Sequence, residues 1–244
     1  TGEGNALTIT VDDASVDAGA LNAINNRTSV AITVDPATTT ITGALSDILT
    51  AYEANTDGTI TGLGNENITV DNTGSITSAD LNELNSLTTG NVSVNGVTTV
   101  SGTLSEIVES YSDSNIAGVI TGLSNEAITV TDTGSIDAAT VNVLNGKTTG
   151  VIDLTTATTV TGALSDIKAL YDAPLTEVTG LGNEAITISD TGTVSSSDLN
   201  DLNELTTGVV SITSATTVSG TLSQLVDSYS SSNIAGVINL SLIH

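Results

Sequence analysis

The chain has 244 residues, of which 28 are acidic and only three are basic, so its formal net charge is −25. A charge of this sign repels phosphate backbones and anionic lipid, which argues against nucleic acid as a partner. The only aromatic residues are four tyrosines, and there is no cysteine. The core must therefore come from small aliphatic side chains, without disulfide or zinc–sulfur sites. No apolar run approaches the ~20 residues of a membrane-spanning helix, so we predict no membrane insertion.

The sequence repeats itself with a period of 58 to 60 residues, as shown by related strings that begin at Asn65, Asn125 and Asn183. A second string, TTVSGTLS, begins at Thr98 and recurs 118 residues later at Thr216, which indicates a larger unit of two repeats. Self-similarity at such a period is typical of repeat architectures. We predict one repeat solenoid over residues 1–244, with repeats at approximately 6–66, 67–126, 127–184 and 185–244.

Each 59-residue repeat divides into two related halves that both read strand, turn, strand, short helix and loop. Such a unit cannot bury its apolar face alone and must stack on its neighbours. We therefore predict an α/β solenoid of about eight coils, each with short parallel strands and one short helix. The coils begin near residues 6, 30, 67, 91, 127, 151, 185 and 209.

The predicted strands alternate apolar residues with threonine, so that apolar side chains share one face. The first strands of odd coils are 68–70, 128–130 and 186–188, and those of even coils contain Ile32, Val92, Ile152 and Val210. The predicted helices carry apolar residues at helical spacing, such as Leu104, Ile107 and Tyr111. All four tyrosines fall at this last position, namely Tyr52, Tyr111, Tyr171 and Tyr229.

Helix starts carry capping signals. Thr103 with Glu106, and Thr221 with Gln224, fit the capping box. Odd coils place a side chain that accepts hydrogen bonds at the N-cap position, namely Asp17, Thr77, Asp137 and Ser195. The helices span only two or three turns, so packing on neighbouring coils must stabilise them.

Catalytic motifs are missing from this pattern. The only histidine is His244, which excludes a histidine-based triad or a multi-histidine metal site within this chain. No serine lies in a nucleophile elbow. Glycines at 61–65 and 179–183 follow no phosphate-loop pattern and predict tight turns instead. We therefore expect that the chain is not an enzyme.

Carboxylates recur at fixed repeat positions. Glu66, Glu126 and Glu184 precede the first strand of odd coils, whereas Asp13, Asp132 and Asp190 follow it and Asn72 takes that place once. Calcium binds such oxygen ligands, which makes Glu66, Glu126, Asp132, Glu184 and Asp190 candidate ligands for the only cofactor we consider. The alternative is a solvated acidic face screened by salt. The sequence lacks both the EF-hand loop and the nonapeptide of calcium-binding β-rolls.

Threonines also recur in pairs or triplets, at 38–40, 98–99, 158–159 and 216–217. Regular ranks of threonine on a flat sheet are the pattern of ice-binding solenoids. The alternative is a threonine-rich β-face without a ligand, because threonine suits strands.

The strings TGLGNEAIT (179–187), DTGSI (132–136), LN-x-LN-x-x-TTG (199–208) and TTVTGALSDI (158–167) resemble the tandem repeats of giant extracellular and cell-surface proteins of marine cyanobacteria such as swimming Synechococcus. The resemblance covers residues 6–238. It implies a surface location, a very long parent polypeptide, and a part in motility, adhesion or a surface layer. It implies no catalytic residue. The sequence departs from the pattern after Ile238, where NLSLIH replaces TGL-x-NE.

These observations predict a non-enzymatic structural module of a large secreted or cell-surface protein, acting as a rod, spacer, filament or surface-layer scaffold. Its partners would be neighbouring repeats or identical chains, joined end to end or laterally, because open solenoid ends expose unpaired strand edges. The alternatives are a calcium-dependent adhesin, an ice-binding module, or a fibre shaft of the phage type, which bundles three chains.

Overall fold

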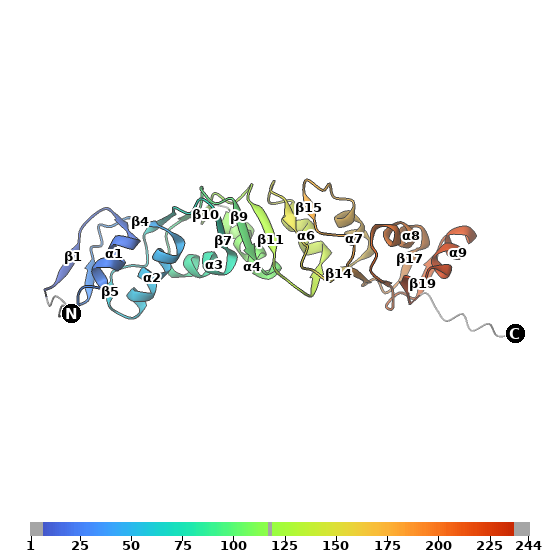
Figure 1. Cartoon of the computed structure of the whole chain (residues 1–244), viewed down its shortest axis with the longest axis horizontal. Coiled ribbons are helices and arrows are strands. Elements are labelled where there is room, and N and C mark those ends of the chain that lie inside the picture. The colour runs from blue at the N-terminus through green and yellow to red at the C-terminus, as the bar shows by residue number, and fades with distance from the viewer. Residues whose placement is uncertain (1–6, 117–118, 237–244) are drawn as a thin grey trace. The chain divides into compact units, whose positions relative to one another are not determined.

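The computed structural model describes residues 7–116 and 119–236 as an α/β structure, in which parallel strands form stacked sheets and short helices connect them, as in a solenoid-like repeat (Figure 1). The chain divides into two compact units, Thr1–Glu126 and Ala127–His244. The division falls at one of the predicted repeat boundaries, between residues 126 and 127.

The first unit, coloured blue to green in Figure 1, contains strands and short helices in regular succession. In chain order these are β1 (Ile9–Val11), β2 (Ser15–Asp17), α1 (Ala18–Asn25), β3 (Ile32–Val34), β4 (Thr40–Gly43), α2 (Leu45–Thr56), β5 (Ile60–Thr61), β6 (Asn67–Val70), β7 (Ser75–Thr77), α3 (Ser78–Leu87), β8 (Val92–Ser93), β9 (Thr99–Gly102), α4 (Leu104–Ser110), α5 (Asp113–Ile116) and β10 (Ile120–Thr121).

The second unit has the same elements in the same order, except that its described residues form no helix corresponding to α5. It contains β11 (Ala127–Val130), β12 (Ser135–Asp137), α6 (Ala138–Asn145), β13 (Ile152–Asp153), β14 (Thr159–Gly162), α7 (Leu164–Tyr171), β15 (Val178–Thr179), β16 (Ala185–Ile188), β17 (Thr193–Ser195), α8 (Ser196–Leu205), β18 (Val210–Ser211), β19 (Thr217–Ser219), α9 (Leu222–Ser230) and β20 (Ile234–Ala235).

All strand pairs within each unit are parallel. In the first unit the orders are β1-β3-β5 and β2-β4-β6-β8-β10, and β7 pairs with β9. In the second unit the orders are β11-β13-β15 and β12-β14-β16-β18-β20, and β17 pairs with β19. The predicted parallel strands at 68–70, 128–130 and 186–188 are therefore confirmed.

Within each unit the chain steps from one sheet to the next once, after the second coil in the first unit and after the sixth in the second, which the sequence did not predict. The short strand β5 occupies the place beside β3. The following strand β6 therefore pairs with β4, which is the second strand of the preceding coil. In the second unit, β15 and β16 make the same exchange beside β13 and β14. At the first step Gly62 has a φ of +98°, and an added Cβ would lie 2.3 Å from the Val34 carbonyl oxygen. Only glycine fits this crossing without displacing the backbone.

Buried ranks of β-branched residues form the core of each unit. Register places equivalent side chains beside one another across the five-stranded sheets. The rank of the first unit is Val16, Ile41, Ile68, Val92 and Ile120, and that of the second is Ile136, Val160, Ile186, Val210 and Ile234. Residues one position later in these strands face away from the core and are mostly threonine or serine. The alternation predicted from the sequence is thus what fixes the register.

Every predicted helix cap is present. Asp17, Thr77, Asp137 and Ser195 each accept a hydrogen bond from the backbone N–H three residues later, and both capping boxes form. Helices of successive coils pack together, α1 to α4 in one unit and α6 to α9 in the other. An asparagine of each odd-coil helix donates to a backbone carbonyl of the next helix at 2.8 to 3.0 Å: Asn22 to Asp47, Asn82 to Glu106, Asn142 to Asp166 and Asn200 to Gln224.

Candidate functional site

Glu66, one of the candidate calcium ligands, is buried, with only 2% of its surface exposed. Its Oε2 atom accepts three hydrogen bonds: from the Tyr52 hydroxyl at 2.9 Å, from the Gly64 N–H at 2.9 Å and from the Asn65 N–H at 3.2 Å. Tyr52 lies on α2, and the two amides belong to the loop that leads into β6. The carboxylate therefore fixes this loop to the helix before it.

The same arrangement recurs at the two other candidate glutamates, which are also buried. Glu126 accepts from the Tyr111 hydroxyl at 3.1 Å and from the amides of Ser124 and Asn125 at 2.8 and 3.2 Å. Glu184 accepts from the Tyr171 hydroxyl at 3.0 Å and from the amides of Gly182 and Asn183 at 2.7 and 3.3 Å. We call Tyr52 with Glu66, Tyr111 with Glu126, and Tyr171 with Glu184 the tyrosine–glutamate pairs.

Burial makes each phenol of these pairs a hydrogen-bond donor. Desolvation raises the pKa of Tyr52, Tyr111 and Tyr171 far above the usual range, and the neighbouring carboxylate adds to this rise. Each hydroxyl therefore stays protonated and donates to the glutamate. A buried carboxylate is costly unless its oxygens are hydrogen-bonded, and charge-assisted bonds to one hydroxyl and two amides offset that cost.

The TTG string at 88–90, which belongs to the next coil, contacts the loop that leads into β6. Thr88 Oγ1 donates to the Glu66 carbonyl oxygen at 2.7 Å, and the Thr89 N–H donates to the Gly64 carbonyl oxygen at 3.0 Å. A Cβ on Gly90 would lie 2.2 Å from the Glu66 carbonyl oxygen. The second unit repeats these contacts at Thr206, Thr207 and Gly208 around Gly182 and Glu184. The TTG string thus requires glycine because two backbones touch there.

Asp190, a further calcium candidate, caps a helix. Its Oδ2 accepts from the Leu164 N–H at 2.7 Å, and Asn72 accepts from the Leu45 N–H at 2.8 Å in the first unit. These residues begin α7 and α2, whose N-cap positions hold alanine and give no side-chain hydrogen bond. The helices α4 and α9 begin with capping boxes of their own. The N-cap residue therefore alternates between alanine and threonine along the even coils, with the period of 118 residues seen in the sequence.

Asp132 accepts a hydrogen bond through its carbonyl oxygen from the Thr156 hydroxyl at 2.9 Å. Among residues 7–116 and 119–236, no three acidic, histidine or cysteine side chains gather closely enough to hold a metal ion. Within that part of the chain, Oε1 of Glu184 is buried without a hydrogen-bond partner. Calcium binding by Glu66, Glu126, Asp132, Glu184 or Asp190 stays a prediction, but three of these carboxylates serve as internal acceptors and a fourth as a helix cap.

No family model, curated protein or solved structure matches this chain. What it does must therefore be inferred from its own contacts. In the part of the chain that the structure describes, no helix is both long and apolar enough to cross a membrane.

The paired threonines also have protein partners. Their hydroxyls donate to backbone carbonyls of the preceding coil: Thr39 to Ala14 at 3.1 Å, Thr98 to Gly74 at 3.4 Å, Thr158 to Gly134 at 3.3 Å and Thr216 to Gly192 at 3.4 Å. This periodicity therefore has a structural explanation in the joining of successive coils. Ice binding by these ranks stays a prediction.

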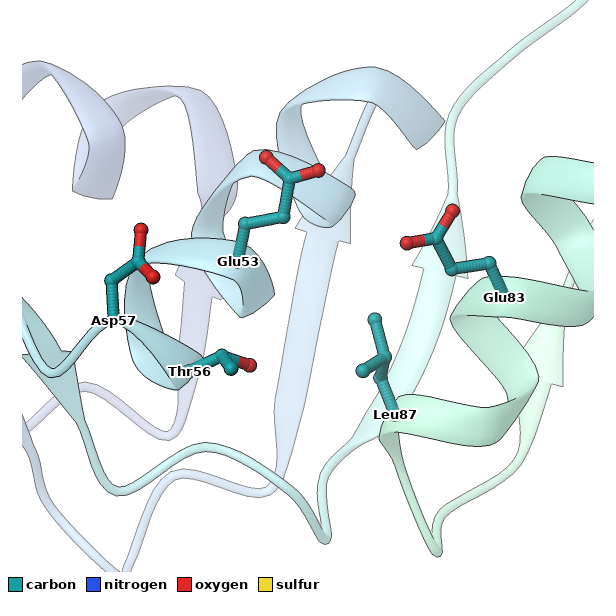
Figure 2. A pocket seen from close by; sticks show the side chains of 5 residues that line it. All are labelled: Glu53, Thr56, Asp57, Glu83 and Leu87. Carbon is teal, nitrogen blue, oxygen red and sulfur yellow. The ribbon is translucent and has the colours of Figure 1, made fainter.

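A groove of about 450 Å³ lies between α2 and α3 (Figure 2). Glu53 and Asp57 line it from the side of α2, and Glu83 and Leu87 line it from α3. The figure shows the carboxylates of Glu53 and Glu83 directed into the space between the helices. The sequence did not single out these residues, because they follow no repeat position shared by all coils. They contribute to the acidic surface, on which like charges repel one another.

The role of the tyrosines was not predicted, although the sequence holds a signal for it. Each tyrosine of the three pairs stands 13 to 15 residues before the glutamate it contacts. No glutamate follows Tyr229, and this tyrosine is exposed. A buried hydroxyl requires an acceptor, so the joint recurrence of tyrosine and glutamate could have indicated the pairs.

Proposed function

We propose that the chain is a non-enzymatic structural module: a solenoid of eight coils, built from 59-residue repeats of two related halves, that serves as a rod, spacer or scaffold in a large secreted or cell-surface protein. The observation that carries this proposal is that the recurrent polar residues, such as the glutamates and threonines, form hydrogen bonds within and between neighbouring coils.

The junctions between coils support a mechanical role. From the second coil to the third, Asn72 caps α2 and Thr88 holds the loop at Glu66. From the third to the fourth, Asn82 donates to the carbonyl of Glu106. Each junction thus combines a parallel strand ladder with polar contacts beside it. Ladders of this kind resist separation because many hydrogen bonds must break together.

The high negative charge is consistent with a chain that lies among many copies of itself or in a long array of repeats. A net charge of −25 keeps copies soluble and mutually repelling until salt or cations screen them. The resemblance of the TGLGNEAIT and DTGSI strings to repeats of giant cyanobacterial surface proteins supports an extracellular or cell-surface location. On the same ground we propose a part in motility, adhesion or a surface layer.

Force–extension measurement on single chains held at both ends tests the mechanical role. We expect successive unfolding steps, each releasing about 200 Å of contour length, the length of one extended 59-residue repeat. Glu184→Gln should lower the force of one step, because the amide removes a charge-assisted acceptor from a buried pair. Glu204→Gln, an exposed change on α8, is the matched control and should leave every step unchanged. Extension without discrete steps contradicts the proposal.

The alternatives have separate tests. A rise in unfolding temperature with calcium that magnesium at equal ionic strength does not reproduce would favour a calcium-dependent adhesin. Shaping of ice crystals would favour an ice-binding module. A trimeric mass in solution would favour a fibre shaft.

A further inference from the structure

The chain contains the dipeptide Asn–Gly twice, at Asn95–Gly96 and at Asn145–Gly146. Asparagine is a thermolabile residue. A following glycine favours its breakdown, because no side chain hinders attack by the glycine nitrogen on the asparagine side-chain carbon Cγ. The reaction requires a glycine N–H that is free to lose its proton and an asparagine side chain that can reach the next backbone nitrogen. The two dipeptides differ in both respects.

Asn95 and Gly96 form an exposed turn between β8 and β9. The Val97 N–H closes this turn by donating to the Val94 carbonyl oxygen at 3.0 Å. Among the described residues, the Gly96 N–H donates no hydrogen bond. The Asn95 Nδ2 donates to the Ser93 hydroxyl at 2.7 Å, in a contact that is open to solvent. The nitrogen and the carboxamide that must react therefore both lie at the surface.

Asn145 is held in the opposite way. It is the last residue of α6 and is half-buried. The Gly146 N–H donates to the Asn142 carbonyl oxygen at 3.2 Å, and the Asn145 Nδ2 donates to Glu177 Oε2 at 3.0 Å. The last turn of the helix must open before the Gly146 nitrogen can react. Asn145 is thus a reference within the same chain for an Asn–Gly dipeptide that the fold protects.

Other coils show which side chains this turn accepts. Asp35 takes the place of Asn95 in the longer turn of the second coil, and its Oδ1 accepts from the Ala37 N–H at 2.8 Å. Thr155 and Thr213 take the same place in the sixth and eighth coils. An aspartate or a threonine at residue 95 is therefore compatible with the fold.

The backbone of Asn95, in contrast, has no room to change. Gly122, which directly follows β10, has a φ of +96°. A Cβ added to it would lie 2.8 Å from the Asn95 nitrogen and 3.0 Å from the Asn95 Cα. Gly180 approaches the Thr155 nitrogen in the same manner in the second unit, at 2.4 Å from its added Cβ. A longer main chain at residue 95 would displace the Gly122 backbone.

We propose that Asn95 deamidates spontaneously, and that its isoaspartate product loosens the fourth coil at Gly122. The Gly96 nitrogen loses its proton to solvent and forms a bond to Asn95 Cγ. The bond from Cγ to Nδ2 breaks, and the amide nitrogen takes up a proton and leaves as ammonia. Water then opens the cyclic imide. Attack at Cγ gives aspartate, whereas attack at the backbone carbonyl gives isoaspartate, whose main chain runs through Cβ and Cγ.

The two products have different consequences. Both add a negative charge to the turn, but aspartate keeps the normal backbone and fits as Asp35 does. Isoaspartate lengthens the main chain by one carbon where Gly122 touches it. The Val94 N–H, next to the changed residue, donates to the Thr121 carbonyl oxygen at 2.9 Å within the pairing of β8 and β10. This pairing is the one that isoaspartate weakens.

Peptide mapping by mass spectrometry of the chain incubated at neutral and at mildly alkaline pH tests the first step. We expect aspartate and isoaspartate to form at residue 95 at least about tenfold faster than at residue 145, because α6 must open first. The rate should rise with pH, since the Gly96 nitrogen must lose its proton. Asn95→Thr should abolish the reaction there and leave the rate at Asn145 unchanged. Equal rates at the two sites, or an intact Asn95 beside a deamidated Asn145, overturn the proposal.

Thermal unfolding of the aged chain tests the second step. Ion exchange separates the deamidated chains, and methylation by an isoaspartate methyltransferase measures their isoaspartate content. The isoaspartate fraction should unfold at a lower temperature than the fresh chain. Asn95→Asp, which carries the same charge on a normal backbone, should unfold as the fresh chain does. If Asn95→Asp loses as much stability as the isoaspartate fraction, the added charge is responsible and the role given to Gly122 is wrong.

Discussion

Glu66→Ala should lower the free energy of unfolding of the first unit by about 3–5 kcal/mol, the range for removing one partner from a buried charged contact. The substitution leaves the Tyr52 hydroxyl and the amides of Gly64 and Asn65 without their common acceptor. Glu66→Gln should lose less, about 1–2 kcal/mol, because its carbonyl oxygen still accepts but without the charge. Urea unfolding followed by circular dichroism measures both changes.

Glu83→Ala is the matched control for this carboxylate. Glu83 is exposed on α3 and lines the groove of Figure 2, so its removal should change stability by no more than about 0.5 kcal/mol. Equal effects at Glu66 and Glu83 would show that Glu66 contributes only charge. A stabilised Glu66→Ala variant would show that the free energy lost by burying the carboxylate exceeds the free energy gained from its three hydrogen bonds.

Gly90→Ala should be as damaging, although it adds a single methyl group. The Cβ would lie 2.2 Å from the carbonyl oxygen and 2.5 Å from the carbonyl carbon of Glu66, which belong to rigid backbone. The two coils must separate locally, and the parallel ladder between β6 and β8 begins just after this point. We expect a loss of about 3 kcal/mol or more, as for overpacking that no side-chain rotation relieves.

Gly74→Ala separates this steric effect from the general effect of removing a glycine. No atom lies within 4 Å of a Cβ added at Gly74, and its φ is not positive. This variant should be neutral or gain up to about 1 kcal/mol by restricting the unfolded chain. If thermal unfolding shows the same loss at both positions, close approach of the backbones is not the reason for glycine in the TTG string.

Local features of the fold could be predicted from the sequence because their causes lie within a few residues. Alternation at 68–70 predicts a strand with one buried face, and Thr103 with Glu106 predicts a helix start. Both depend on neighbours along the chain. The step between sheets could not be predicted, because it depends on β5 occupying the place beside β3, about 30 residues earlier in sequence.

The recurrence of the candidate residues is visible in the sequence, but their hydrogen-bond partners are not. The recurrence of Glu66, Glu126 and Glu184 indicates that these positions matter to the repeat. A regular series of acidic residues, taken alone, suggests an exposed cation site, whereas these three are buried. Their partners are tyrosines on the preceding helices, and helix placement was beyond the sequence pattern. Asp190 posed the same difficulty, since the helix that it caps begins 26 residues earlier.

Amide hydrogen exchange in the Glu66→Gln variant tests most directly the claim that recurrent polar residues join neighbouring coils. The amides of Gly64 and Asn65 donate to Glu66, and the Thr89 amide of the next coil donates to the Gly64 carbonyl. We expect exchange to accelerate at all three amides, while Gly182 and Thr207, which make the same contacts in the second unit, keep their protection. Faster exchange at Gly64 and Asn65 with an unchanged Thr89 would contradict the claim, because the glutamate would then hold only its own loop.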